Sequence, residues 1–504
     1  MREHLYRLPL LVHLMGIGAA AMLLPAAYAT AARDWDSARV FLHSSLIFLG
    51  LTAMIGVAMV NFAPRRQARS HLLALLGAYL VLPVILAVPI YESVGDTRFL
   101  NAYFEMVSSL TTTGATIYDD PARLSGAAHL WRAMVGWMGG FLVWVTAIAI
   151  LAPLNLGGYE VLGDRTERTG RITQIIELAD APARLRRYGL QLLPIYLVLT
   201  LVLWVALLIA GDTALTAICH AMSTLATSGI SPKGGLEGAG SGFAGEVLIF
   251  LFFGFALSRR TFEREGNISR RRRLRHDPEI RMAVGLVVIV PVFLFLRHWW
   301  GAFEVEAGQS FGQGLQALWG SLFTVLSFLS TTGFVSNSWD SAQSWSGLHT
   351  PGLILMGLAL IGGGVATTAG GVKLLRVYAL YKHGLRELEK LVYPSSIGGS
   401  GALARYLRNR GAYIAWIFFM LFAITIAVVM LALSLTGLGF DTSVVLTIAA
   451  LSNTGPLAAV AAEAPISYSE LSDLAKAILI GSMVLGRLET LAIIALLNPE
   501  FWRS

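Results

Sequence analysis

The sequence predicts an all-α polytopic membrane protein in which four tandem units surround one pore and two extra transmembrane helices precede them. Its composition is typical of this class, because 55% of the 504 residues are hydrophobic, 14% are charged and the mean hydropathy is +0.65. Apolar segments of about 20 residues, long enough to cross a bilayer, recur along the chain. Shorter apolar segments lie between them and end in turns that contain one glycine.

The long apolar segments give ten expected spans, at residues 8–29, 40–62, 72–91, 130–151, 188–210, 243–262, 280–300, 351–381, 404–436 and 473–497. The short segments are expected half-helices, at residues 98–110, 213–226, 311–329 and 441–452. From the third span onward, each half-helix lies between two spans. The repeating unit is therefore span, half-helix, glycine turn, span. We expect the extra pair at 1–69 and the units at 70–156, 157–264, 265–395 and 396–504.

The basic residues support this topology independently of hydropathy. Of the 38 Lys and Arg residues, 26 fall in four joining segments, at residues 63–70, 154–187, 259–281 and 373–410. Because cytoplasmic loops are enriched in Lys and Arg, these segments and both termini are expected in the cytoplasm. Acidic residues such as Glu105 favour the opposite face and are expected to line an anionic vestibule that concentrates cations.

The N-terminus has a second reading as a secretory signal. Arg2 and Arg7 precede an apolar run that ends in small residues at positions 26–29, as at a cleavage site. We expect a retained span instead, and the intact mass of the purified protein distinguishes the two.

Four turns pair hydroxyl or amide side chains with one glycine. They are Thr112-Thr113-Gly114, Thr227-Ser228-Gly229, Thr331-Thr332-Gly333 and Asn453-Thr454-Gly455. Backbone that leaves helical geometry at membrane depth is tolerated only where protein buries it or water reaches it. Glycine permits dihedrals that aim successive carbonyl oxygens at one point, and each half-helix would direct its negative end there. Four such turns around an axis could replace the hydration shell of a cation, whereas ordinary helix-capping glycines would explain one turn but not four.

The eighth span contains an unusual run of small residues. Its members are Gly362, Gly363, Gly364, Thr367, Thr368, Gly370, Gly371 and Lys373. Each interior glycine weakens a helix by up to about 1 kcal/mol relative to alanine, so we expect a break here. The alternative is a continuous helix with a glycine-rich packing face.

Arg487 lies within the last apolar span. Charge at membrane depth is costly enough to suggest a functional role. Alternatives are snorkelling to the interface or pairing with Glu489.

Other classes of function find no support in the residues. The ten His residues lack ligand spacing, and neither a phosphate-binding glycine loop nor a Gly-x-Ser-x-Gly elbow occurs, so no enzyme and no bound cofactor are expected. The single cysteine, Cys219, excludes an intrachain disulfide and is expected to be a core residue. The expected environment is the lipid bilayer, with no nucleic acid.

Taken together, the four turns, the run 362–373 and the sequence Gly486-Arg487-Leu488-Glu489 resemble the Trk/Ktr/HKT superfamily of potassium transporters over nearly the whole chain. The extra N-terminal pair resembles its bacterial TrkH-type pore subunit. The resemblance implies potassium uptake across the inner membrane, with the ion bound only by carbonyl groups of the four turns. It also implies that the run 362–373 is an intramembrane gating loop, with Arg487 beside it in the pore.

The resemblance further implies a homodimer docked on a cytoplasmic TrkA-type nucleotide-binding subunit. Three positions depart from the family pattern, namely Ser228, Ala366 and Leu457, each where a glycine is usual. The first and third bear on ion selectivity and the second on loop mobility. A sodium-permeable or poorly selective transporter, and a non-conducting scaffold or sensor, therefore remain alternatives.

Overall fold

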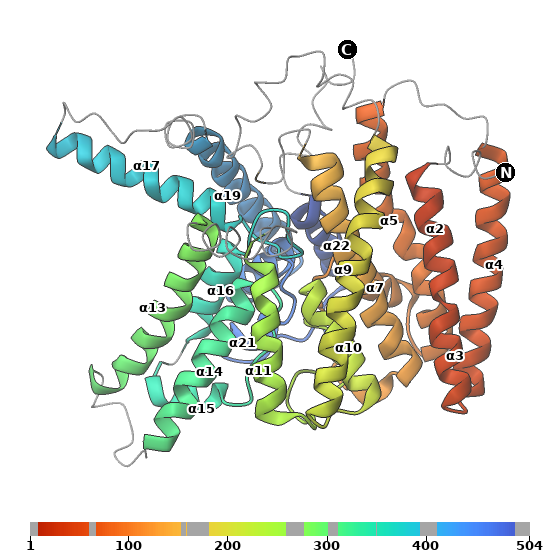
Figure 1. Ribbon diagram of the computed structural model, residues 1–504, viewed down its shortest axis with the longest axis horizontal. Coiled ribbons are helices and arrows are strands. Elements are labelled where there is room, and N and C mark those ends of the chain that lie inside the picture. The colour runs from red at the N-terminus through yellow and green to blue at the C-terminus, as the bar shows by residue number, and fades with distance from the viewer. Residues whose placement is uncertain are drawn as a thin grey trace.

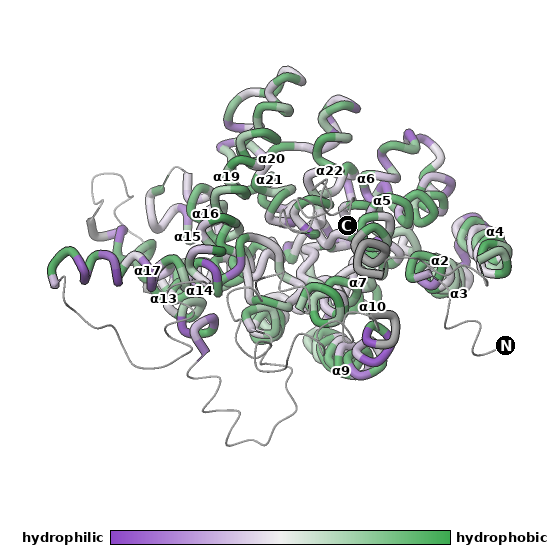
Figure 2. Tube along the Cα trace, turned by 90° about the horizontal axis from the view of Figure 1, so that it is seen from above, coloured by the Kyte–Doolittle hydropathy of each residue, from purple (hydrophilic) through white to green (hydrophobic). Residues whose placement is uncertain are grey.

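The computed structural model describes residues 9–59, 67–152, 158, 181–258, 277–300, 311–348, 350–393 and 411–488. These residues form helices and turns without a β-strand, which confirms the expected all-α class (Figure 1). Among them, seven helices are long and apolar enough to cross a membrane. The helices that face outward expose apolar side chains, such as Ile47 on α4 and Val198 on α9, and both helices are largely green in Figure 2. The bundle therefore has the surface of a membrane protein.

The first helices form a pair at one side of the bundle (Figure 1). They are α2 (Leu10–Ala21), which continues almost directly into α3 (Leu23–Ala31), and α4 (Trp35–Met59). Both α2 and α3 pack on α4, while α2 also contacts α5 and α3 contacts α7. The pair thus covers the first unit.

The remaining helices lie within residues 67–488, where the four units were expected from residue 70 onward. The first two units contain α5 (Gln67–Val94), α6 (Phe99–Leu110), η1 (Pro121–Arg123), α7 (Gly126–Thr146), η2 (Ala147–Leu151), α9 (Ala181–Ile209), α10 (Ala214–Ala226), α11 (Gly242–Phe253) and η4 (Gly254–Ala256). The last two contain α13 (Pro278–Trp300), α14 (Phe311–Leu329), α15 (Trp339–Ser346), α16 (Gly352–Ile361), α17 (Leu374–Val392), α19 (Ala412–Ser434), α20 (Phe440–Leu451), α21 (Leu457–Val460) and α22 (Asp473–Leu488). The boundaries between units stay a prediction.

Helix packing closes the units into a ring. Each half-helix packs against the helix before it and the helix after it, as α6 does with α5 and α7. The helix after each half-helix also packs on the half-helix of the next unit: α7 on α10, α11 on α14, α16 on α20, and α22 back on α6. The last contact joins the two ends of the series. The four half-helices therefore surround one axis.

Three helices differ from the expected spans. The helix expected at 243–262 is shorter, because α11 and η4 end at Ala256. The amphipathic α15 was not expected as an element. The end of the span expected at 351–381 belongs to α17, which continues to Val392 and projects from the bundle (Figure 1). Its polar face carries the ion pairs Arg386–Glu389 at 3.3 Å and Lys390–Glu387 at 2.6 Å, which suit water and not lipid.

Candidate functional site

The four half-helices end in the same hydrogen-bonded turn. The residue two positions before each turn glycine is left-handed, with φ of 54° at Thr112, 53° at Thr227, 59° at Thr331 and 54° at Asn453. Its N–H donates to the carbonyl three residues back, at 2.9–3.3 Å, and the next N–H donates to the carbonyl five residues back, at 2.8–3.0 Å. This pair of bonds is the Schellman motif. The turns are therefore equivalent in backbone geometry as well as in sequence.

Helix capping does not account for the glycines. The left-handed capping position in each turn belongs to a threonine or asparagine, and the glycine follows two residues later. A positive φ is an uncommon, strained conformation for a β-branched residue such as threonine. Strain of this kind persists only where the surrounding structure imposes it, and it is concentrated at functional sites.

The glycines let the four turns approach one another closely. A methyl group added at Gly114 would lie 1.8 Å from the Ser228 oxygen, and one at Gly229 would lie 2.3 Å from the Thr332 oxygen. Added at Gly333, it would lie 3.0 Å from the side chain of Pro456, and at Gly455 it would lie 2.2 Å from the Ala115 nitrogen. Each turn thus touches the next, and the fourth touches the first. We call this arrangement the turn ring.

The turn ring contains buried carbonyl groups that accept no hydrogen bond from the described residues. Within the described part of the chain, no N–H or O–H donates to the carbonyl of the left-handed residue in any of the four turns. The Ser228 and Thr332 carbonyls also receive no donor from these residues. By contrast, the Thr113 carbonyl accepts from Gly455 N–H at 2.6 Å, and the Thr454 carbonyl accepts from Leu457 N–H at 3.1 Å. A dehydrated cation would satisfy the unpaired oxygens.

Different side chains support the turns from behind. The half-helix position nine residues before the turn glycine is Glu105, His220, Thr324 or Leu446. Glu105 accepts from Ile117 N–H at 3.1 Å. His220 Nε2 lies 2.9 Å from the Ser231 hydroxyl, and Thr324 accepts from Ser336 N–H at 3.3 Å. In three units this position therefore fastens the segment that follows the turn, while the fourth unit has an apolar residue there.

The sequence suggested that Glu105 lines an exposed vestibule, and this expectation was wrong. Its side chain is buried in α6 and forms an ion pair with Arg132 of α7 at 2.5 Å. Glu105 and Arg132 thus act as an internal fastening beside the first turn. Glu105 stands nine residues before its turn glycine, as His220 and Thr324 do. This shared position could have indicated its role from the sequence, but it was not recognised there.

The helix expected at 351–381 is interrupted where the glycines predicted. α16 ends at Ile361 and α17 begins at Leu374. The two arms of the connection, the loop 362–373, lie side by side, because Val372 N–H donates to Leu360 and Lys373 N–H to Ile361, both at 2.9 Å. A methyl group on Gly362 would lie 2.1 Å from the Gly370 oxygen, so the close approach of the two ends of the loop requires glycine at position 362.

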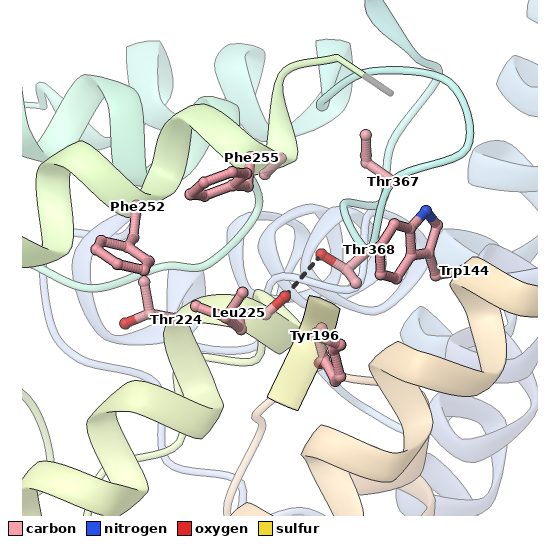
Figure 3. Close-up of a pocket in the computed structure, with 9 residues that line it drawn as sticks. Trp144, Tyr196, Thr224, Leu225, Phe252, Phe255, Thr367 and Thr368 are labelled. Carbon is pink, nitrogen blue, oxygen red and sulfur yellow. Dashed lines mark hydrogen bonds between the residues drawn. The ribbon is translucent and has the colours of Figure 1, made fainter. Parts of the chain in front are cut away.

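The loop 362–373 lies against the ends of three half-helices. Thr368 Oγ1 donates to the Leu225 carbonyl of α10 at 3.2 Å, shown as the dashed line in Figure 3. Gly370 N–H donates to Thr331 Oγ1 at 2.7 Å. A methyl group on Gly370 would lie 1.9 Å from the Ser452 oxygen at the end of α20. The loop therefore covers one side of the turn ring.

Arg487 connects the loop to the remaining half-helix. Its Nη1 donates to the Thr368 carbonyl and its Nε to the Thr111 carbonyl, both at 2.7 Å, and its Nη2 donates to Thr112 Oγ1. The side chain is only 7% exposed. These contacts contradict snorkelling, while pairing with Glu489 lies outside the described residues. Through Arg487, the loop is bonded to the first turn as well.

Two loop residues have strained backbone. Ala366 has φ of 55° and Lys373 has φ of 84°, both in the region that favours glycine. Lys373 Nζ donates to the Ala369 carbonyl, and Val365 N–H donates to Glu279 Oε1 at 2.8 Å. Nothing in the sequence indicated that Glu279, at the start of α13, would bind the loop. These contacts hold the loop in a conformation that its own backbone does not favour.

Comparisons with known proteins show the family of the chain. Residues 40–234 and 278–503 match the TrkH family, described as a cation transport protein. The Trk system potassium uptake protein TrkH of Vibrio parahaemolyticus is 31% identical, over 97% of this chain and 98% of that protein. TrkH of Salmonella typhimurium is 30% identical, over 96% of each chain. The crystal structure of the potassium transporter TrkH from Vibrio parahaemolyticus matches with a TM-score of 0.82 and 27% identity, covering 100% of both chains. The chain therefore belongs to the TrkH family of cation transport proteins.

Proposed function

We propose that this chain takes up potassium across the bacterial inner membrane through the turn ring, with both termini in the cytoplasm. The observation that carries the proposal is the set of left-handed Schellman turns around one axis, in which the buried carbonyl oxygens of the left-handed residues accept no hydrogen bond from any described residue. Carbonyl rings of this kind replace the hydration shell of potassium in selective pores. The relatives named as Trk system potassium uptake proteins support the same ion.

The residues proposed to bind the ion are those of the four turns. They are Thr112, Thr113, Gly114, Thr227, Ser228, Gly229, Thr331, Thr332, Gly333, Asn453, Thr454 and Gly455. The carbonyls of Thr113 and Thr454 would have to exchange their hydrogen bonds before they bind the ion, since each has a donor in this conformation. The unpaired carbonyls of the left-handed residues are available without such a change.

The loop 362–373 is proposed as the gate, in its obstructing position. It rests on three half-helices directly and on the fourth through Arg487, so an ion leaving the turn ring on that side meets the loop. The strained φ at Ala366 and Lys373 suits a segment with a second conformation. A TrkA-type cytoplasmic partner would favour the open conformation, and the working assembly would be a homodimer with one pore in each protomer.

Ion uptake tests the proposal. The chain is expressed with and without its TrkA-type partner in bacteria that lack their own potassium uptake, and potassium and sodium uptake are measured per molecule of membrane protein. We expect uptake that favours potassium and that increases with the partner. Equal uptake of both ions would instead show a poorly selective transporter. A chain that reaches the membrane but moves neither ion, in cells or in liposomes, would refute transport.

A further inference from the structure

A buried carboxylate joins the second unit to the third. Glu246 lies on α11 and is only 3% exposed. Its Oε2 accepts from Trp319 Nε1 at 2.8 Å and from the Ser336 hydroxyl at 2.7 Å. Its Oε1 accepts from Asn337 N–H at 2.7 Å. All three donors belong to the third unit, so the carboxylate acts across the boundary between units.

The donors lie on both sides of the third turn. Trp319 is on the half-helix α14, which leads into the turn, whereas Ser336 and Asn337 follow Gly333 by three and four residues. One carboxylate therefore fixes the segment that enters the turn and the segment that leaves it. At the same boundary, Gly229 meets the Thr332 carbonyl inside the turn ring.

A carboxylate is needed for this set of contacts. Both of its oxygens accept, and hydrogen bonds to a charged acceptor are shorter and stronger than those between neutral groups. Glutamine has the same shape, but its amide nitrogen can only donate. Placed at position 246, that nitrogen would oppose a donor in either orientation: the Asn337 N–H in place of Oε1, or Trp319 Nε1 in place of Oε2. The third turn would then lose part of its attachment to α11.

We propose that Glu246 is a positioning residue for ion selection, which sets the place of the third turn relative to the second. This inference rests on the proposed function of the turn ring. The carbonyls of Ser228 and Thr332, which accept no bond from a described residue, lie on the two sides of the boundary that Glu246 fixes. A change in their spacing alters the coordination on which discrimination between potassium and sodium depends.

Glu246→Gln tests the assignment, with Glu237→Gln as its control. Glu237 is an exposed acid in the same unit, so the control removes the same charge without touching the third turn. Potassium and sodium uptake per molecule and the KM for potassium are measured in the full chain with its partner. We expect the potassium to sodium ratio of Glu246→Gln to fall by about fivefold or more, as for loss of a coupling of about 1 kcal/mol. The control should keep the wild-type ratio.

Two further variants keep the test decisive if Glu246→Gln fails to reach the membrane. Ser336→Ala and Trp319→Phe each remove one donor and leave the carboxylate in place, and both should lower the ratio by a smaller factor. Reduced protein level with a wild-type ratio and KM in all the variants would overturn the positioning role. A wild-type chain that moves neither ion would overturn the proposed function instead, so the two failures are distinguishable.

Discussion

Replacing Arg487 with glutamine should increase potassium flux per molecule. In the wild type, the guanidinium bonds the Thr368 carbonyl of the loop and, through two other nitrogens, the Thr111 carbonyl and the Thr112 hydroxyl. A glutamine side chain is shorter and has one donor group, so it cannot bridge the loop and the first turn together. The substitution should therefore release the loop from this side of the turn ring.

The size of the effect follows from the bond that is lost. A hydrogen bond from a charged donor contributes about 1.5–3 kcal/mol. If the loop rests in the obstructing position, losing the bond to Thr368 shifts the balance between closed and open loops by roughly 10- to 150-fold. Flux rises with the open fraction and stops rising when most loops are open. Removal of a fixed positive charge beside the path lowers the barrier to a cation and acts in the same direction.

Liposomes containing the purified chain without its partner provide the assay. Flux is divided by the amount of folded protein, so that lost stability is not mistaken for lost transport. Arg487→Lys separates charge from bridging, because lysine keeps the charge but cannot make all three bonds at once. We expect the lysine variant to lie between the wild type and the glutamine variant. Equal flux per molecule from all three proteins would refute a role for Arg487 in conduction.

Three smaller tests address the ring and the loop. Gly114→Ser should reduce the ratio of potassium to sodium uptake while the protein reaches the membrane at its normal level, because the serine Cβ would lie 1.8 Å from the Ser228 oxygen. An unchanged ratio and rate would show that this turn does not select the ion. Ala366→Gly should raise the thermal unfolding midpoint and lower flux without the partner. The reason is that glycine relieves left-handed strain of about 1–2 kcal/mol in the closed loop. A lower midpoint would show that the strain is not released. Glu279→Ala should raise partner-independent flux, because the Val365 N–H loses its acceptor; flux that still depends fully on the partner would contradict this.

Local sequence signals predicted the turns and the interrupted helix correctly. Apolar segments that are too short to span and end near a glycine gave α6 and α10 almost to the residue. The glycines at 362–364 and 370–371 located the break, because they act on the backbone where they stand. Each of these features depends on residues that are neighbours along the chain.

Features that depend on distant residues could not be predicted in this way. The sequence named Arg487 but suggested Glu489, two positions away, as one possible partner, whereas its bonds reach residues more than 100 positions away. Glu246 was not singled out at all, since its donors lie 73 to 91 positions away and only packing of α11 on α14 brings them together. A buried acid that accepts from neutral donors has no local pattern of its own.

The turn ring is not fourfold symmetric, and its boundaries are fastened in different ways. Between the second and third turns, Glu246 acts from behind, and the Ser228 and Thr332 carbonyls accept no bond from the part of the chain that the structure describes. Between the fourth and first, the turns bond each other directly: Gly455 N–H donates to the Thr113 carbonyl at 2.6 Å, and Asn453 Nδ2 donates to Thr113 Oγ1 at 3.0 Å. Arg487 attaches the loop at this same boundary. The loop also bonds the third turn, where Gly370 N–H donates to Thr331 Oγ1 at 2.7 Å. Movement of the loop should therefore reach the first turn through Arg487 and the third turn directly, and at the third turn the contacts of Glu246 should oppose the displacement.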